Sequence, residues 1–534
     1  MFTRLRALLA VILLVGFYVL VVGTVAGLFV LARLLGDPWG GYAAIAALTV
    51  GGAVTVALVR ATRVRPGEPK GLTATSDQAP RLWDMVRDLA DQVNTRAPDT
   101  ILIVPEVNAA VSENARLLGL VGGRRTLLVG LPLLQAYTVD QLRAVLAHEM
   151  GHYSRSHTRL AAVTYRGRMT MIYIVGHVGP ANLVGRLFTG YARLYFLVES
   201  AVSRRQEVEA DRAAARVAGR TAAAGALADL PALGAAWHFY IVRYVGRGWQ
   251  SGYAPDAIFG GFRELLAARA DELTKLRSVV AEQERSPWDS HPPIADRVAN
   301  IAAMPESHVD ADVRPATTLL PNLAALTGRL EELYFSREGQ RLVPWDEYTV
   351  HAAEAELAED ADAVLAEFAR QTGRESASAT ELLDAIGTPS YDEFLRGVLP
   401  QATEAERHEA HGPLATVIAA CAVRSGAASW RHSWSSGPAI LVGTDGEKLD
   451  AERIAKQLAD PQTTAQAQKE LLERGILLDL TVEQQPEAAP PERVIGAIAN
   501  VVVDGKRRDL LIYDTGLLIL GPAAVCCNQP VRAI

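Results

Sequence analysis

Two histidines four residues apart, with a glutamate directly after the first, form the pattern best suited to chemistry: His148-Glu149-Met150-Gly151-His152. On a helix, residues four apart lie on one face, so His148 and His152 can direct imidazole nitrogens at a single metal ion. Glu149 can then reach a water on that ion rather than the metal itself. The pattern predicts a catalytic Zn²⁺ site in which zinc lowers the pKa of its bound water. Glu149 would accept a proton from this water as it attacks a carbonyl.

A catalytic zinc ion takes three protein ligands and one water, so a third ligand must lie outside this motif. The nearest histidine downstream is His157. It does not fit the metzincin pattern, which requires glycine at position 155 and histidine at position 158, where this chain has Arg155 and Thr158. We therefore interpret His157 as a surface or membrane-facing residue.

An acidic pair further along the chain is the better candidate for the third ligand. Glu207 and Asp211 lie four residues apart in the run 203–214, which has the composition of a helix ending near Gly219. On that helix Glu207 could bind zinc while Asp211 holds a ligand imidazole in the correct tautomer. Taken alone, an acidic pair on a basic helix is more often a salt-bridged surface face.

The segments around the motif predict how it is positioned. Thr138 and Gln141 have the spacing of a capping box, which begins a helix. Apolar residues in 142–146 would bury that helix in a domain core, with His148 near its end. Other expected elements are a helix over 82–93 and strands over 100–104 and 125–129.

Two apolar runs near the N-terminus are long enough to cross a bilayer, which requires about 20 residues of helix. They predict transmembrane helices at about 7–34 and 42–59, within a membrane region 1–65. Both outer flanks are basic while the loop between them is nearly neutral, so the positive-inside rule places the flanks in the cytoplasm. A third uncharged stretch, 169–185, makes 160–200 a hydrophobic segment that could span the membrane, re-enter it or lie on its surface.

Charge and cysteine content narrow the function classes further. The 534-residue chain has a net charge of -7, which argues against nucleic acid as its main partner. Its three cysteines, Cys421, Cys526 and Cys527, form no disulfide framework and suit a reducing compartment. The adjacent pair could bind metal or sense redox state, although two unpaired thiols near a chain end is the favoured interpretation.

Three segments occur in an order that resembles a known family. HEMGH at 148–152, EVEAD at 207–211 and HPPIADR at 291–297 are similar to motifs of the HtpX-like membrane metalloproteases and their relatives, the CAAX prenyl proteases. The resemblance covers roughly residues 100–305 and the two anchors. It implies one Zn²⁺ per chain bound by His148, His152 and Glu207, with Glu149 as general base and Asp211 orienting a ligand.

The resemblance also implies residues that handle the substrate. His291 would help to stabilise the tetrahedral oxyanion, and Arg297 would hold the site or the substrate backbone. The segment Asn108-Ala109-Ala110-Val111 resembles the edge strand against which this family hydrogen-bonds an extended substrate, and Asn108, Ala109 and Ala110 are its expected substrate-binding residues. An aromatic residue is more usual in the family where Ala110 stands, which leaves the local pocket and the substrate preference open.

Together these observations predict a mainly α protein with a small β-sheet (α+β). A zincin-type metallopeptidase domain at 76–305 would follow the two transmembrane helices. An accessory region would follow it, helical over 306–440 and a small α/β module over 441–534, where Asp504-Gly505 is a hairpin signal. Nothing beyond about residue 305 resembles the family core.

We expect a membrane-anchored zinc endopeptidase that hydrolyses membrane or membrane-proximal proteins by attack of a zinc-bound water. Its expected location is the cytoplasmic membrane, multi-pass, with the peptidase domain facing the cytoplasm. The expected partners are a protein or peptide substrate, the lipid membrane and a protein that binds the C-terminal region. Two alternatives are an inactive membrane scaffold that retains the fold and a prenyl-protein (CAAX-type) protease.

Overall fold

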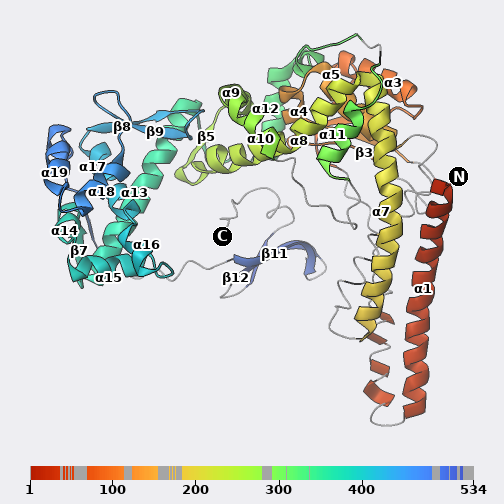
Figure 1. Cartoon of the computed structure of the whole chain (residues 1–534), viewed down its shortest axis with the longest axis horizontal. Coiled ribbons are helices and arrows are strands. Elements are labelled where there is room, and N and C mark those ends of the chain that lie inside the picture. The colour runs from red at the N-terminus through yellow and green to blue at the C-terminus, as the bar shows by residue number, and fades with distance from the viewer. Residues whose placement is uncertain are drawn as a thin grey trace. The chain divides into compact units, whose positions relative to one another are not determined.

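The computed structural model divides the chain into two compact units. Unit 1 comprises Met1–Trp237 and Ala270–Leu333, and unit 2 comprises His238–Arg269 and Tyr334–Ile534 (Figure 1). The structure describes residues 2–35, 40–42, 44–45, 48–49, 51–52, 69–113, 123–153, 168, 171, 175, 183–279, 292–307, 310–335, 337–483, 494–503, 506–513 and 517–520.

A four-stranded sheet lies in unit 1. Its strands are β1 (Leu72–Ala74), β2 (Thr100–Val104), β3 (Ala109–Glu113) and β4 (Arg125–Gly130), in the order β1-β2-β4-β3. β2 and β4 are parallel, whereas β1 and β3 are antiparallel to their neighbours. The strands expected over 100–104 and 125–129 are confirmed, and their alternate side chains, such as Ile101 and Leu127, are fully buried. β3 is left at the edge of the sheet.

Helices surround this sheet in unit 1. The capping box at Thr138 and Gln141 is confirmed at the start of α5, and α3 confirms the helix expected over 82–93. Gly219, with a φ of +87°, ends α7 as expected, because glycine adopts this left-handed conformation without a steric cost. The helices are α3 (Pro80–Gln92), α4 (Leu131–Ala136), α5 (Val139–Gly151), α7 (Leu183–Ala218), α8 (Arg220–Tyr240), α10 (Ala270–Val279), α11 (Ile294–Ala302) and α12 (Leu323–Tyr334).

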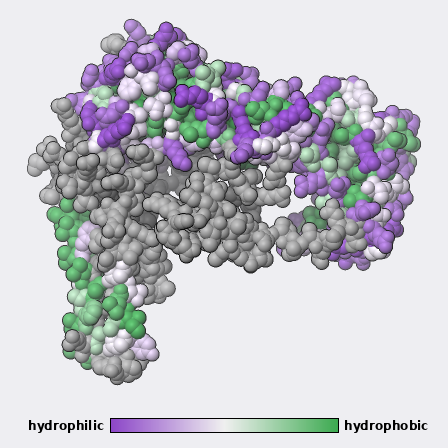
Figure 2. All heavy atoms as spheres, turned by 180° about the vertical axis from the view of Figure 1, so that it is seen from behind, coloured by the Kyte–Doolittle hydropathy of each residue, from purple (hydrophilic) through white to green (hydrophobic). Residues whose placement is uncertain are grey.

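Two long helices, α1 (Phe2–Leu35) and α7, run side by side (Figure 1). Phe17 of α1 packs edge-to-face on Phe188 of α7 with ring centroids 5.7 Å apart, and both rings are fully buried. Much of the exposed surface of the pair is apolar (Figure 2): Leu187, Leu194 and Leu197 of α7 are 42–49% exposed. Arg186 and Arg193 of α7 are exposed among these leucines.

One helix among the described residues, Val11–Ala32, has the length and apolar character to cross a membrane. The second expected span, 42–59, lies mostly outside the described residues, so two spans are not established. Of the expected hydrophobic segment 160–200, residues 183–200 form the first half of α7, and most of 160–182 lies outside the described residues.

Unit 2 is also mainly helical, and its core lies between α13 (Trp345–Gln371) and α17 (Gly412–Arg424), with Phe368 and Ile418 fully buried. Its other helices are α9 (Ile258–Ala268), α14 (Ala379–Asp384), α15 (Pro389–Val398), α16 (Glu404–His408), α18 (Ala451–Ala459) and α19 (Thr464–Glu473). Its strands pair as β5 (Tyr253–Pro255) with β6 (Arg341–Val343), β7 (Ser376–Ser378) with β10 (Thr481–Glu483), and β8 (Ala428–His432) with β9 (Ala439–Gly443).

The last strands of unit 2 are β11 (Val494–Val503), β12 (Lys506–Tyr513) and β13 (Leu517–Leu520), which form one antiparallel sheet. Val503 pairs with Lys506, which confirms the hairpin expected at Asp504-Gly505, although those two residues lie outside the described part. The architecture is thus mainly helical with small sheets, as expected. The boundaries placed at residues 305 and 440 stay predictions.

Candidate metal centre

The metal motif lies where α5 and α7 come into close contact. His148 is in the last turn of α5, and His152 caps its C-terminus. A Cβ atom on Gly151 would lie 3.4 Å from the Cα of Ala210 on α7, at the tight end of ordinary contact. Because glycine has no side chain, the two helix backbones can approach closely there, which brings the acidic residues of α7 to the histidines of α5.

Three side chains from these helices form a compact donor group. Nε2 of His148 lies 3.2 Å from Nε2 of His152 and 3.5 Å from Oε2 of Glu207, and His152 Nε2 lies 3.4 Å from Glu207 Oε1. Ligands about 2.0–2.1 Å from a tetrahedral zinc ion are roughly 3.3 Å from one another. Within the described residues, these three side chains offer ligand atoms within 4.8 Å of one another, so the donor set fits zinc in type and spacing.

Asp211 contacts the far side of the first histidine. Its Oδ1 lies 3.0 Å from Nδ1 of His148, and the side chain is almost fully buried. An Nδ1–H that donates to this carboxylate leaves Nε2 of His148 as the lone-pair nitrogen facing the donor group. Burial opposes ionisation of Asp211, but its hydrogen bonds with His148 and Arg297 and the positive charge of Arg297 outweigh it. The pKa of the Asp211 carboxyl therefore lies below its ordinary value.

Arg297, on α11, joins the two carboxylates of α7. Its Nε and Nη2 donate to the two oxygens of Asp211 at 3.0 and 2.6 Å, and its Nη1 lies 3.2 Å from Oε2 of Glu207. Burial alone would lower the pKa of Arg297, but hydrogen bonding and the negative charges around it raise that pKa above its ordinary value. The guanidinium therefore stays charged and offsets the burial of two acids.

The other expected catalytic residues are placed differently. Glu149 is half-buried on α5, one residue after His148, and it interacts electrostatically with Arg297. His291 lies outside the described residues. The structure thus brings His148, Glu149, His152, Glu207, Asp211 and Arg297 together in one site.

The register of β3 shows how the expected substrate-binding residues are oriented. Gly130 N–H at the end of β4 donates to the carbonyl of Asn108 at 2.7 Å, one residue beyond the Ala109–Val129 pair, so the carbonyl of Asn108 faces β4. Antiparallel ladders alternate, so the main-chain groups of Ala110 also face β4, whereas those of Ala109 and Val111 face away from the sheet. Of the three expected residues, Ala109 therefore presents its main chain at the open edge. Val111, the last residue of the expected edge-strand motif, does the same.

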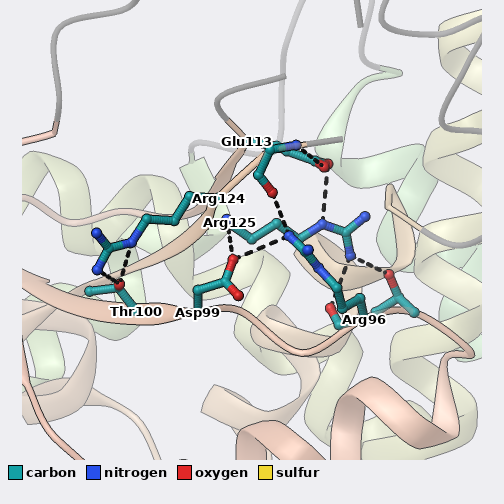
Figure 3. Close-up of polar contacts among 8 residues, drawn as sticks. Arg96, Asp99, Thr100, Glu113, Arg124 and Arg125 are labelled. Atoms are coloured by element: carbon teal, nitrogen blue, oxygen red, sulfur yellow. Dashed lines mark hydrogen bonds and ion pairs between the residues drawn. The ribbon is translucent and has the colours of Figure 1, made fainter. Parts of the chain in front are cut away.

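A buried arginine at the end of the sheet was not singled out from the sequence. Arg125, at the start of β4, donates through Nε to Glu113 of β3 at 3.1 Å, and its own N–H donates to Asp99 at 2.7 Å (Figure 3). Its Nη1 donates to Thr95 Oγ1 and to the carbonyl of Arg96, both at 2.9 Å. These contacts fix the end of β3 relative to the loop before β2.

Comparison with known proteins places this arrangement in a family. Residues 76–304 match Peptidase family M48. This region is similar to the peptidase domain of that family. Members of the M48 family are zinc metallopeptidases, which agrees with the donor set above.

The chain is also similar to a curated protein, the "Protease HtpX homolog" of Sulfurihydrogenibium sp. (strain YO3AOP1). The two are 29% identical over an alignment of 160 residues, which covers 27% of this chain and 52% of that protein. The chain thus spans about half the length of this relative. No solved structure gives a significant match. The resemblance to HtpX-like M48 proteases is confirmed.

Proposed function

We propose that this protein is a membrane-anchored zinc endopeptidase in which His148, His152 and Glu207 hold the metal. The observation that carries the proposal is the mutual separation of their ligand atoms, 3.2–3.5 Å, which suits one tetrahedral ion. Membership of the M48 family supports peptide-bond hydrolysis as the reaction.

The chain's own residues would divide the reaction between them. Zinc bound here would act as a Lewis acid and lower the pKa of a water. Glu149 would accept a proton from the attacking water and return it to the leaving amine. Asp211 would fix the tautomer of His148, and Arg297 would hold Asp211 and Glu207 ionised. By the family resemblance, His291 would help to stabilise the oxyanion.

The apolar surface of α1 and α7 supports membrane association. Exposed leucines on α7 and a 22-residue apolar stretch on α1 have the character of a lipid-facing surface. Because α7 also carries Glu207, a site on this helix would act on membrane or membrane-proximal proteins. The basic flanks of the N-terminal region favour a cytoplasmic site.

The test is Glu149→Gln, compared with wild type in purified, detergent-solubilised protein. We expect about one zinc ion per chain in both, measured by mass spectrometry of the metal. Cleavage of β-casein should fall at least about a hundredfold, since a positioned general base contributes roughly that much or more.

Glu209→Gln is the matched control, because it makes the same change two residues from Glu207, at a glutamate paired with Arg205 on α7. It should retain wild-type cleavage. Undiminished cleavage by Glu149→Gln would refute the mechanism, and absence of zinc from the wild-type protein would favour the inactive scaffold.

A further inference from the structure

The open edge of β3 is where an extended peptide would add a strand, if the proposed function holds. In the part of the chain that the structure describes, β3 pairs with β4 alone. The outward-facing main-chain groups at its first and middle residues are those of Ala109 and Val111. A peptide strand would therefore hydrogen-bond to these two residues, two positions apart.

One of these outward-facing groups is already engaged by a side chain of the protein. The hydroxyl of Tyr153 donates to the carbonyl of Val111 at 2.7 Å. Tyr153 directly follows His152, so the end of the metal-site helix is joined to the middle of the edge strand. Its hydroxyl thus bonds the carbonyl that a peptide N–H would otherwise approach.

Tyr153 is held in this position from two further directions. Its carbonyl accepts a hydrogen bond from Thr95 Oγ1 at 2.7 Å, and the guanidinium carbon of Arg125 lies 5.3 Å from its ring centroid. Arg125 is itself buried and bonded to Glu113 at the end of β3. The Tyr153 hydroxyl is thus held in position to donate to the strand, because the main chain and the ring of Tyr153 are both restrained.

We propose that Tyr153 is a specificity-determining residue that satisfies the Val111 carbonyl in place of the substrate. A peptide then pairs fully with Ala109, but the peptide residue opposite Val111 needs no N–H. The substrates that fit are extended peptides in which that residue can be proline or N-alkylated. Without the Tyr153 hydrogen bond, the Val111 carbonyl would instead favour a peptide residue that donates its backbone N–H there.

The experiment begins with a β-casein segment that the wild-type protein cleaves in a Glu149-dependent manner. A fluorescent copy is synthesised with each backbone nitrogen N-methylated in turn. Binding is measured by anisotropy to the inactive Glu149→Gln protein, so that the readout is affinity rather than turnover. Tyr153→Phe is introduced into this background because it keeps the ring on Arg125 and removes the hydroxyl.

With Tyr153 present, we expect N-methylation to leave affinity unchanged at the position two residues from the one paired with Ala109, as it does at the alternate positions whose N–H faces away from β3. In Tyr153→Phe, the unmethylated peptide should bind about three- to tenfold tighter, and methylation at that position should remove the gain. Tyr137→Phe is the matched control, since it also loses a 2.7 Å hydroxyl-to-carbonyl bond, to Ala226, and should leave the methylation pattern unchanged.

Two results would overturn the inference in distinguishable ways. The same methylation pattern in Tyr153→Phe as in its parent would refute the role of Tyr153 and leave the peptidase assignment intact. Failure of the wild-type protein to cleave any β-casein peptide would instead refute the proposed function, and this inference with it.

Discussion

Arg297→Gln tests whether the two acids of α7 depend on a single cation. Asp211 and Glu207 are 4% and 2% exposed, and Arg297, at 8%, contacts both. Glutamine has neither the charge nor the planar fork of donors, so the variant leaves two buried carboxylates without their guanidinium. Breaking a buried ion pair by removing one partner costs about 3–5 kcal/mol.

The expected thermal shift follows from this cost. Larger domains lose roughly 2–4 °C of Tm for each kcal/mol, so Tm should fall by about 6–20 °C when metal is removed with a chelator. With zinc added, the fall should be smaller, because the ion would neutralise part of the charge on Glu207. Arg297→Lys should lie between wild type and Arg297→Gln, since it keeps a charge but not the bidentate geometry.

The assay is thermal unfolding followed by circular dichroism, with and without chelator. Arg87→Gln is the control, because Arg87 pairs with Asp84 at 3.3 Å on the surface, where both side chains are more than half exposed. That variant should not shift Tm measurably. If the metal-free Arg297→Gln protein had a Tm within about 1 °C of the metal-free wild type, the two buried acids would not need this cation for stability.

Two further predictions concern metal and thiol chemistry. Removing zinc from the wild-type protein should lower Tm, and adding zinc back at about 100 times its Kd should restore about 2.7 kcal/mol of the free energy of unfolding. His152→Ala should show no zinc-dependent shift of Tm in calorimetry. Cys421 is fully buried, and burial raises its pKa to about 11, so iodoacetamide at pH 8 should not label a Cys526→Ser/Cys527→Ser variant until it is denatured. Rapid labelling of the native variant would contradict this environment for Cys421.

Local patterns predicted much of what holds the site. The capping box at Thr138 and the glycine that ends α7 each depend on a few neighbouring residues, and both are confirmed. The four-residue spacing of the histidines is equally local, and the structure brings both rings close to Glu207. The pairing of Glu207 and Asp211 with His148 was harder to predict. Its spacing equally suits a surface salt bridge, and the order of the three family motifs decided between the two interpretations.

Contacts between distant segments could not be predicted in this way. Arg297 was expected to hold the site or the substrate, but its two bonds to Asp211 depend on how α11 packs against α7. The hydrogen bond from Tyr153 to Val111 joins residues 42 positions apart, and no periodic pattern in the sequence predicts it. Asn108 and Ala110 were expected to face the substrate, yet only the register with β4 determines which main-chain groups face outward.

The continuity of α7 has a consequence for the length of this segment. This 36-residue helix, about 54 Å long, carries at one end the rings that pack on α1 and at the other Glu207 and Asp211. Deleting one residue between Leu197 and Glu207 would turn one end by about 100° relative to the other and shorten the helix by about 1.5 Å. Glu207 would then point away from the histidines, even though every ligand was still present in the sequence. The segment therefore tolerates substitution more readily than any change in its number of residues.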